Sequence, residues 1–267
     1  MIEVELEKVG INKKERILSI SSLNPVVAFV GEKIIDVCKK LSSSGHRSLP
    51  VVDRKMRLLG IITITDIFSF FISGGNMNDF VENIMSREVV GCDANESIGY
   101  VLQKMKISKR GRLPVTQEGK IVGVISETDF ILAAKSFEAF ENIVIDEVMT
   151  KKPFFVTPSF TLREVIRTMV NGKYRRLPVV ENRALVGYVT STLIFNYLVN
   201  NLFSGKILDR TISEIMTKNM ITVLKRESLS NVLKKMKEKK ISSMLIVDED
   251  NKLEGIFTER DYINLLV

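Results

Sequence analysis

The sequence has no tryptophan, a single histidine and only two cysteines. One histidine, His46, excludes zinc sites built from several histidines, and any Ser-His-Asp or Cys-His mechanism would depend on that residue alone. The two cysteines, Cys38 and Cys92, lie among apolar residues and are too few for a disulfide framework. A reducing compartment is therefore expected, and the sequence predicts a cytoplasmic protein.

Several common signatures are also missing. The chain contains no phosphate-binding G-x-x-x-x-G-K-[ST] loop, no G-x-G-x-x-G and no paired C-x-x-C. No apolar run approaches the roughly 18 residues that a membrane span needs. The acidic, alternating N-terminus is not typical of a secretory signal. We therefore expect no membrane association, no metal site and no catalytic cofactor.

The composition is that of a folded, moderately basic protein. Of 267 residues, 45% are hydrophobic and 27% are charged, which supports a buried core and one large or two ordinary domains. The net charge is +7. Much of this excess lies in the segment Lys225–Lys240, which holds seven bases and two acids.

The chain is built from four copies of one pattern. Leu-Pro-Val recurs with Pro50, Pro114 and Pro178 spaced 64 residues apart, and Met244-Leu245-Ile246 is a degenerate fourth copy. Apolar residues at i, i+3, i+4 and i+7 predict one helix before each copy. These helical stripes are Ile34, Val37, Cys38 and Leu41; Ile98, Val101, Leu102 and Met105; Leu162, Val165, Ile166 and Met169; and Leu229, Val232, Leu233 and Met236. Glycine follows each copy at Gly60, Gly123, Gly187 and Gly255.

Each copy reads as strand, helix, strand, strand, helix. Thr161 and Glu164 form the pattern of a capping box, and Ser97 and Ser228 are plausible helix caps. The fold class is α/β (α+β), with helices covering short apolar strands. One copy is too small to bury much core, so we expect pairs. The predicted domains are 1–138, with repeats at about 17–73 and 80–136, and 139–267, with repeats at about 144–200 and 211–267.

Polar residues gather where the second long strand of each repeat ends. The candidate residues are Thr63, Thr65 and Asp66; Ser126, Thr128 and Asp129; and Thr258, Arg260 and Asp261. The third repeat has Thr190 but carries Leu193 in place of the carboxylate. Helix capping explains any single copy. Ligand binding is the alternative, because an ionised carboxylate accepts hydrogen bonds from both hydroxyls of a ribose.

A second polar cluster precedes each Leu-Pro-Val strand. Its candidate residues are His46, Arg47, Arg110, Arg112, Arg175, Arg176 and Lys240. Arginine suits phosphate because its planar group makes paired, charge-assisted hydrogen bonds. A solvated basic turn explains any one of these residues, but the recurrence in every copy favours an anion site. The fourth repeat has the weakest cluster, with Lys240 alone.

These paired motifs, in four copies over nearly the whole chain, resemble the CBS domain. Repeats two to four also open with Ile84-Met85-Ser86, Val148-Met149-Thr150 and Ile215-Met216-Thr217, as CBS domains often do, whereas the first repeat lacks this opening. The four-repeat layout is similar to the regulatory γ subunit of AMP-activated protein kinase, and the Thr63–Asp66 motif is especially similar.

The resemblance implies a fold and a ligand. CBS repeats pack in pairs as two tandem (Bateman) modules, which can form a flat disc, and adenosine ligands lie in clefts between paired repeats. Asp66, Asp129 and Asp261 would hold the ribose, while the hydroxyls and basic turns would hold phosphate. The residues that would line adenine are Pro25–Val27, Val89–Val90, Phe154–Val156 and Ile221–Val223. The Leu193 cleft should be empty or weak, since leucine accepts no hydrogen bond.

The sequence therefore predicts a non-catalytic regulator that binds adenine nucleotides, AMP first, with ADP, ATP or S-adenosylmethionine as other ligands. Its partner would be an unknown regulated protein, and its assembly a monomeric disc or a homodimer. The alternative is a nucleic-acid-binding protein that uses Lys225–Lys240, although no aromatic residues interleave that segment. A third hypothesis, an enzyme with His46 as general base, has no catalytic-domain-sized segment to support it.

Overall fold

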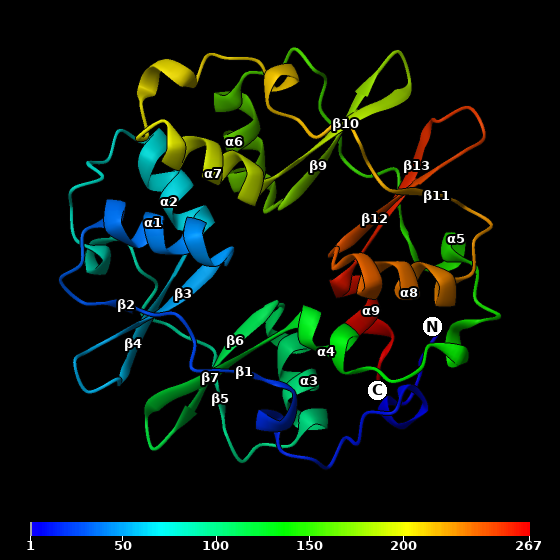
Figure 1. Cartoon of the computed structure of the whole chain (residues 1–267), viewed down its shortest axis with the longest axis horizontal. Helices are drawn as coiled ribbons and strands as arrows, with labels where there is room; N and C mark the ends of the chain where they lie inside the picture. The colour runs from blue at the N-terminus through cyan, green and yellow to red at the C-terminus, as the bar shows by residue number, and fades with distance from the viewer. Residues whose placement is uncertain (1) are drawn as a thin grey trace. The chain divides into compact units, whose positions relative to one another are not determined.

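The computed structural model describes residues 2–267, and repeats one, two and four have the predicted order of strand, helix, strand, strand, helix, whereas the third repeat lacks the first strand (Figure 1). The first repeat contains β2 (Ala28–Phe29), α1 (Ile34–Ser44), β3 (Ser48–Val52), β4 (Leu58–Thr63) and α2 (Ile64–Ile72). The second contains β5 (Cys92–Asp93), α3 (Ile98–Ser108), β6 (Arg112–Gln117), β7 (Lys120–Ser126) and α4 (Glu127–Ala133). The third contains α6 (Leu162–Gly172), β9 (Arg176–Glu181), β10 (Ala184–Thr190) and α7 (Ser191–Asn200). The fourth contains β11 (Thr222–Leu224), α8 (Leu229–Lys239), β12 (Ser243–Val247), β13 (Leu253–Thr258) and α9 (Glu259–Leu265).

The strands pair in the same way in every repeat. The Leu-Pro-Val strand, or its fourth-repeat counterpart β12, lies antiparallel to the strand that follows it. A short preceding segment lies parallel to its other edge: β2, β5 and β11 form strands, and in the third repeat Val156 makes a single bridge to Val179. The mixed α/β class predicted from the sequence is confirmed.

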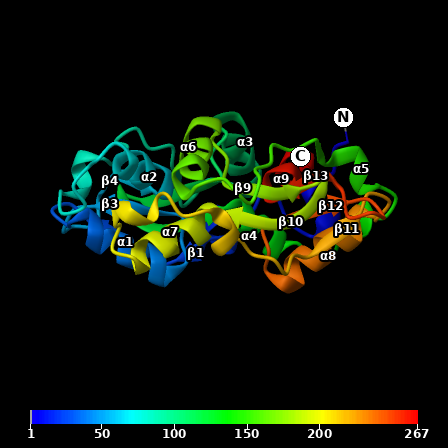
Figure 2. The same cartoon turned by 90° about the horizontal axis from the view of Figure 1, so that it is seen from above.

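The predicted helical stripes form the core. All sixteen stripe residues are at most 2% exposed. Thr161 and Glu164 make the predicted capping box, and the Ser97 and Ser228 hydroxyls accept hydrogen bonds from the backbone of Tyr100 and Asn231. In both views α1 and α2 lie beside β3 and β4 (Figure 1, Figure 2). No helix in residues 2–267 has the length and apolar content to cross a membrane.

The chain divides into two compact units, each with its own hydrophobic core. The even-repeat unit holds repeats two and four, and comprises the N-terminal segment up to Pro25, Val90–Pro153 and Ile221–Val267. The odd-repeat unit holds repeats one and three, and comprises Val26–Val89 and Phe154–Met220. Helices join the repeats within a unit: α4 contacts α8 and α9 in the first, and α2 contacts α6 and α7 in the second.

This division differs from the predicted domains 1–138 and 139–267, which pair repeats that are neighbours in the sequence. The structure groups alternate repeats because their helices pack together. The pairing of neighbouring repeats into modules and a disc concerns how the two units lie relative to one another, and it stays a prediction.

The opening segment of each repeat belongs to the sheet of its sequence neighbour. β1 (Ser22–Leu23), which opens the first repeat, pairs with β7 of the second, and β8 (Thr150–Lys151), which opens the third, pairs with β13 of the fourth. In return, Ser86 bridges to Ile61 and Thr217 bridges to Tyr188. Each sheet is therefore completed by residues from another repeat.

The recurrent glycines explain how these opening segments fit. An added Cβ at Gly60 would lie 2.6 Å from the sulfur of Met85, and one at Gly187 would lie still closer to the sulfur of Met216. These methionines come from the Ile-Met-Ser and Ile-Met-Thr openings. The glycine gives the methionine side chain room to cross the strand, so the two recurrent sequence features are one packing contact.

We predict that Gly187→Ala destabilises the protein by about 1–3 kcal/mol, because the new methyl group overpacks against Met216. Chemical denaturation measures the change, and Met216→Ala in the same chain should recover part of the loss. Gly205→Ala is the matched control: nothing lies within 4 Å of its added Cβ. Equal stability of the Gly187 and Gly205 variants would contradict the contact.

Candidate functional site

The strand register brings the two predicted polar clusters together in every repeat. The last basic-turn position lies opposite the strand-end hydroxyl: Ser48 opposite Thr63, Arg112 opposite Ser126, Arg176 opposite Thr190, and Ser243 opposite Thr258. The carbonyl of the residue before it accepts a hydrogen bond from the first N–H of the following helix, at 2.9–3.2 Å. The basic turn and the strand-end hydroxyl, which are about 15 positions apart in the sequence, therefore lie side by side in each repeat.

The three predicted aspartates cap the helices that follow. The Oδ2 atom of Asp66 accepts hydrogen bonds from the Thr63 backbone (2.9 Å) and hydroxyl (2.7 Å). Asp129 makes the same pair of bonds with Ser126, and Asp261 with Thr258, all at 2.6–2.8 Å. The capping interpretation is therefore correct for all three. These bonds use one carboxylate oxygen and leave Oδ1 out of the capping box.

The third repeat keeps the cap but not the carboxylate. The Thr190 hydroxyl accepts a hydrogen bond from the backbone N–H of Leu193 at 3.0 Å, and the Leu193 side chain packs against the core. The turn has the same backbone path without an acidic acceptor. It therefore offers no equivalent partner for a ribose hydroxyl.

The basic turns divide into two kinds of position. Lys109, Lys173 and Lys240 take the left-handed conformation that ends the preceding helix, with φ of 52–55°. Lys240 is therefore explained by helix termination, where a cation also complements the helix dipole. His46, Arg47, Arg112, Arg175 and Arg176 are partly buried and engaged in interactions beside the turn, while Arg110 is exposed.

In the even-repeat unit, charged groups link the turns of repeats two and four. Arg260 Nε donates to the Glu127 carboxylate at 2.8 Å, and the Thr128 hydroxyl donates to Glu259. Both glutamates are buried, at 0% and 1% exposure. The predicted candidates Thr128 and Arg260 thus contact the opposite repeat's helix.

The odd-repeat unit has no matching acids at these positions. Ile64 and Ser191 stand in its first and third repeats where Glu127 and Glu259 stand in the second and fourth. The two units therefore differ in the chemistry around a shared backbone turn.

Burial sets the protonation behaviour of two of the aspartates. Desolvation raises the pKa of Asp129 and Asp261 above the ordinary value, although the hydrogen bonds from Ser126 and Thr258 oppose it. The nearby carboxylates of Glu259 and Glu127 add to the rise, while Arg112 and Arg260 oppose it. These carboxyls hold their protons to a higher pH than exposed aspartates do.

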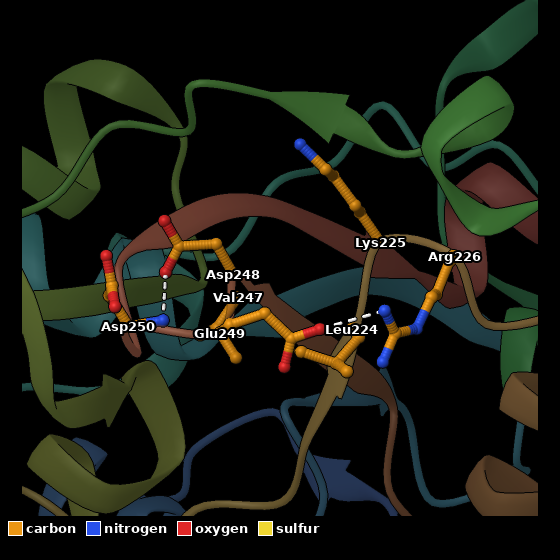
Figure 3. Close-up of a pocket in the computed structure, with 7 residues that line it drawn as sticks. All are labelled: Leu224, Lys225, Arg226, Val247, Asp248, Glu249 and Asp250. Atoms are coloured by element: carbon orange, nitrogen blue, oxygen red, sulfur yellow. Dashed lines mark hydrogen bonds and ion pairs between the residues drawn. The ribbon is translucent and has the colours of Figure 1, made fainter.

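Two pockets lie in the even-repeat unit. The larger, of about 520 Å³, is lined by residues of α4, including Asp129, and by residues of the N-terminal segment. The smaller, of about 290 Å³, lies where β11 ends and β12 turns into β13. Its ionisable residues are Lys225, Arg226 and three acids, and Figure 3 shows Arg226 paired with Glu249, at 2.9 Å.

Among the candidate nucleotide-binding residues of the sequence analysis, Asp129 lines one of these pockets. The smaller pocket lies at the end of the sheet opposite Thr258, since the register runs from Ser243–Thr258 to Val247–Leu253. Its bases Lys225 and Arg226 belong to the basic segment that the sequence analysis offered for nucleic-acid binding, and its acids were not singled out. Four residues of the larger pocket, Gly10, Ile11, Asn12 and Glu15, lie outside the repeats. Residues 2–267 contain no group of three or more His, Cys, Asp and Glu side chains arranged to hold a metal ion.

Comparison with known families identifies the fold. The sequence model of the CBS domain matches residues 17–73, 81–136, 145–200 and 212–267. The chain therefore belongs to the CBS domain family and carries four CBS repeats, which confirms the resemblance seen in the sequence.

Similar whole chains come from archaea. An uncharacterised protein of Methanocaldococcus jannaschii, MJ1225, is 30% identical over 248 residues, covering 84% of this chain and 88% of its own length. Its crystal structure, described as a proposed archaeal homologue of γ-AMPK, matches with a TM-score of 0.85 and covers 94% of this chain and 99% of that one. A 33.4 kDa protein of Thermofilum pendens is 25% identical over 259 residues, covering 88% of this chain and 85% of its own length.

We predict that Arg260→Met lowers the free energy of unfolding by about 1–3 kcal/mol at pH 7, because it removes the Arg260 cation from the buried Glu127 carboxylate. The loss stays below that of a fully buried pair, since the Arg260 side chain is 37% exposed and water screens it. Urea denaturation measures it. Arg226→Met, which breaks the exposed pair with Glu249, is the control and should cost less than about 1 kcal/mol. Similar losses in both variants would argue against a structural role for the buried pair.

We also predict a pH signature for Asp261. Its raised folded-state pKa means that its stabilising contribution is fully present below about pH 3.8 and is lost as the pH rises through the folded value. As the pH rises from about 3.8 through the folded-state pKa, wild type should therefore lose unfolding free energy relative to Asp261→Asn. Glu164→Gln, whose carboxyl pKa is lowered by Thr161, should show the opposite slope. A flat difference for Asp261→Asn would contradict the rise.

Proposed function

We propose that this chain is a non-catalytic regulatory protein that binds adenine nucleotides at the strand-to-helix turns of repeats one, two and four. One observation carries the proposal: in each repeat the register sets the basic turn beside the strand-end hydroxyl, and in these three repeats a carboxylate follows. The arrangement offers acceptors for a ribose diol and donors for a phosphate within one turn.

The capping bonds are compatible with this role. Capping uses Oδ2 of Asp66, Asp129 and Asp261 and fixes the orientation of each carboxylate before a ligand arrives. A preorganised acceptor loses less conformational freedom on binding than a mobile one. Membership of the CBS family and the similarity to MJ1225 along most of both chains support the same assignment.

Regulation would follow from a shift in conformational populations. A ligand that binds one conformation more tightly increases its population, and typical coupling energies are about 1–3 kcal/mol. The exchanged opening segments connect each turn's sheet to a neighbouring repeat, as where β1 pairs with β7. A ligand that orders one turn therefore acts on two repeats at once, and a regulated protein could detect the change.

The nucleic-acid alternative has less support. In the segment Lys225–Lys240, the predicted apolar stripe of α8 is buried, and the lysines of α8 lie on its other, solvated face. Within that face Lys235 pairs with Glu227 at 3.7 Å, and Lys237 donates a hydrogen bond to the backbone carbonyl of Ala134. These contacts give part of the basic segment an intramolecular role.

We predict that AMP raises the melting temperature of the wild-type protein, with about 2.7 kcal/mol of stabilisation for each site when AMP is present at 100 times its dissociation constant. Asp66→Ala and Asp261→Ala should each remove part of this shift, whereas Leu193→Ala should not. Calorimetry with AMP, ADP, ATP and S-adenosylmethionine gives the affinities.

Glu164→Ala is the matched control, because it breaks a capping box of the same kind away from the strand-to-helix turns. It separates loss of a helix cap from loss of a ligand contact. Wild-type protein that binds no purine ligand, but binds single-stranded RNA with a steep salt dependence, would reject the proposal in favour of the alternative.

A further inference from the structure

The pocket that contains Asp129 has a wall from outside the repeats. On one side it is lined by Asp129, Leu132 and Ala133 of α4, and on the other by residues between Gly10 and Ser21. Residues before 17 lie outside the CBS match, so Gly10, Ile11, Asn12 and Glu15 belong to no repeat. The volume, about 520 Å³, falls within the about 300–1,000 Å³ typical of small-molecule sites.

The N-terminal wall is held by backbone hydrogen bonds to both neighbouring helices. The carbonyls of Lys13 and Glu15 accept from Gly99 (3.0 Å) and Ile98 (2.8 Å) at the start of α3. The Val9 carbonyl accepts from Lys135, just beyond α4, at 2.8 Å. These bonds fix the segment at both ends of the pocket, so it is a built surface of the site.

Glycine lets the wall approach this closely. Gly10 has a φ of 78°, and an added Cβ would lie 2.8 Å from the Cβ of Lys135. Buried Val9, Ile11 and Ile17 anchor the same segment in the core. The wall is therefore anchored in the core on both sides of its exposed residues 12–16.

The charges of this pocket do not suit a phosphate. Its ionisable lining residues, within the described chain, are Glu15, Asp129 and Lys135. The basic-turn residues Arg110 and Arg112 are not part of the lining, although the charge of Arg112 reaches Asp129. Two carboxylates face one ammonium group, which favours hydrogen-bond donors without negative charge and repels phosphates.

We propose that the segment Gly10–Ser21 is a specificity element of the second repeat, and that Glu15 makes its site select an uncharged or cationic adenine nucleoside over nucleotides. The inference rests on the proposed function and refines it. A nucleoside supplies two ribose hydroxyls as donors to Asp129 and has no phosphate to meet Glu15. The second repeat therefore senses a different class of adenosine compound from the first and fourth.

The test uses the full chain with Asp66→Asn and Asp261→Asn, so that Asp129 is the one remaining ribose-type carboxylate among the repeat turns. Isothermal titration calorimetry should show adenosine and S-adenosylmethionine binding at least tenfold more tightly than AMP. Adding Glu15→Gln should lower the ratio of adenosine affinity to AMP affinity about three- to tenfold. Glu15→Lys should lower this ratio further. Glu7→Gln and Glu7→Lys, at an exposed glutamate that precedes the segment and lies outside the pocket, are the matched controls.

Hydrogen exchange provides a second readout that does not depend on Glu15. Adenosine should slow exchange of the amides between Gly10 and Ser21 in the same background, and Asp129→Asn should abolish that protection. Circular dichroism checks that each variant is folded.

The outcomes separate the two proposals. AMP binding as tightly as adenosine, unchanged ratios in the Glu15 variants, or no binding to the Asp66→Asn/Asp261→Asn chain while wild type binds AMP would each overturn the specificity inference and leave the proposed function standing. Failure of every purine ligand to bind wild type would overturn the proposed function itself.

Discussion

Antiparallel pairing of two adjacent strands determines where every polar group of the four turns lies. The pairing sets the residue that starts one strand against the hydroxyl that ends the next, as Arg112 lies opposite Ser126. A slip of one residue would exchange the side chains between the two faces of the strand and carry the basic turn away from the cap. The apolar core therefore fixes the polar site, because Leu113 and Val115, both fully buried, would have to repack in another register.

On this shared backbone the repeats have diverged in charge. The third repeat carries Leu193 where the others have a carboxylate, and it has the arginines of its basic turn. The second and fourth carry the buried acids Glu127 and Glu259, each of which contacts the other repeat's helix and helps to raise the pKa of the other repeat's aspartate. A single architecture thus presents turns that range from strongly cationic to nearly balanced, which is the chemical variation that a protein needs to bind related ligands of different charge.

Much of this structure could be predicted from the sequence, because repetition made weak signals add up. The helical stripes, the caps at Thr161 and Ser228 and the order of elements all follow from local periodicity. The grouping of alternate repeats through helices could not be read in this way, since it depends on packing between distant segments. The contact between Glu127 and Arg260 was missed for the same reason, and so was the pocket wall that contains Glu15. Both features appear only when segments that are distant in the sequence are brought together.

The opening segments that complete a neighbour's sheet have a consequence for how such chains evolve. A single excised repeat would lose the strand that covers its own sheet edge and would expose apolar surface around its recurrent glycine, as at Gly255, where Met149 of another repeat fills the space. Gain or loss of one repeat would therefore leave an unsatisfied edge, which favours aggregation. Viable copy numbers should grow by twos, and a four-repeat chain is the second step of that series.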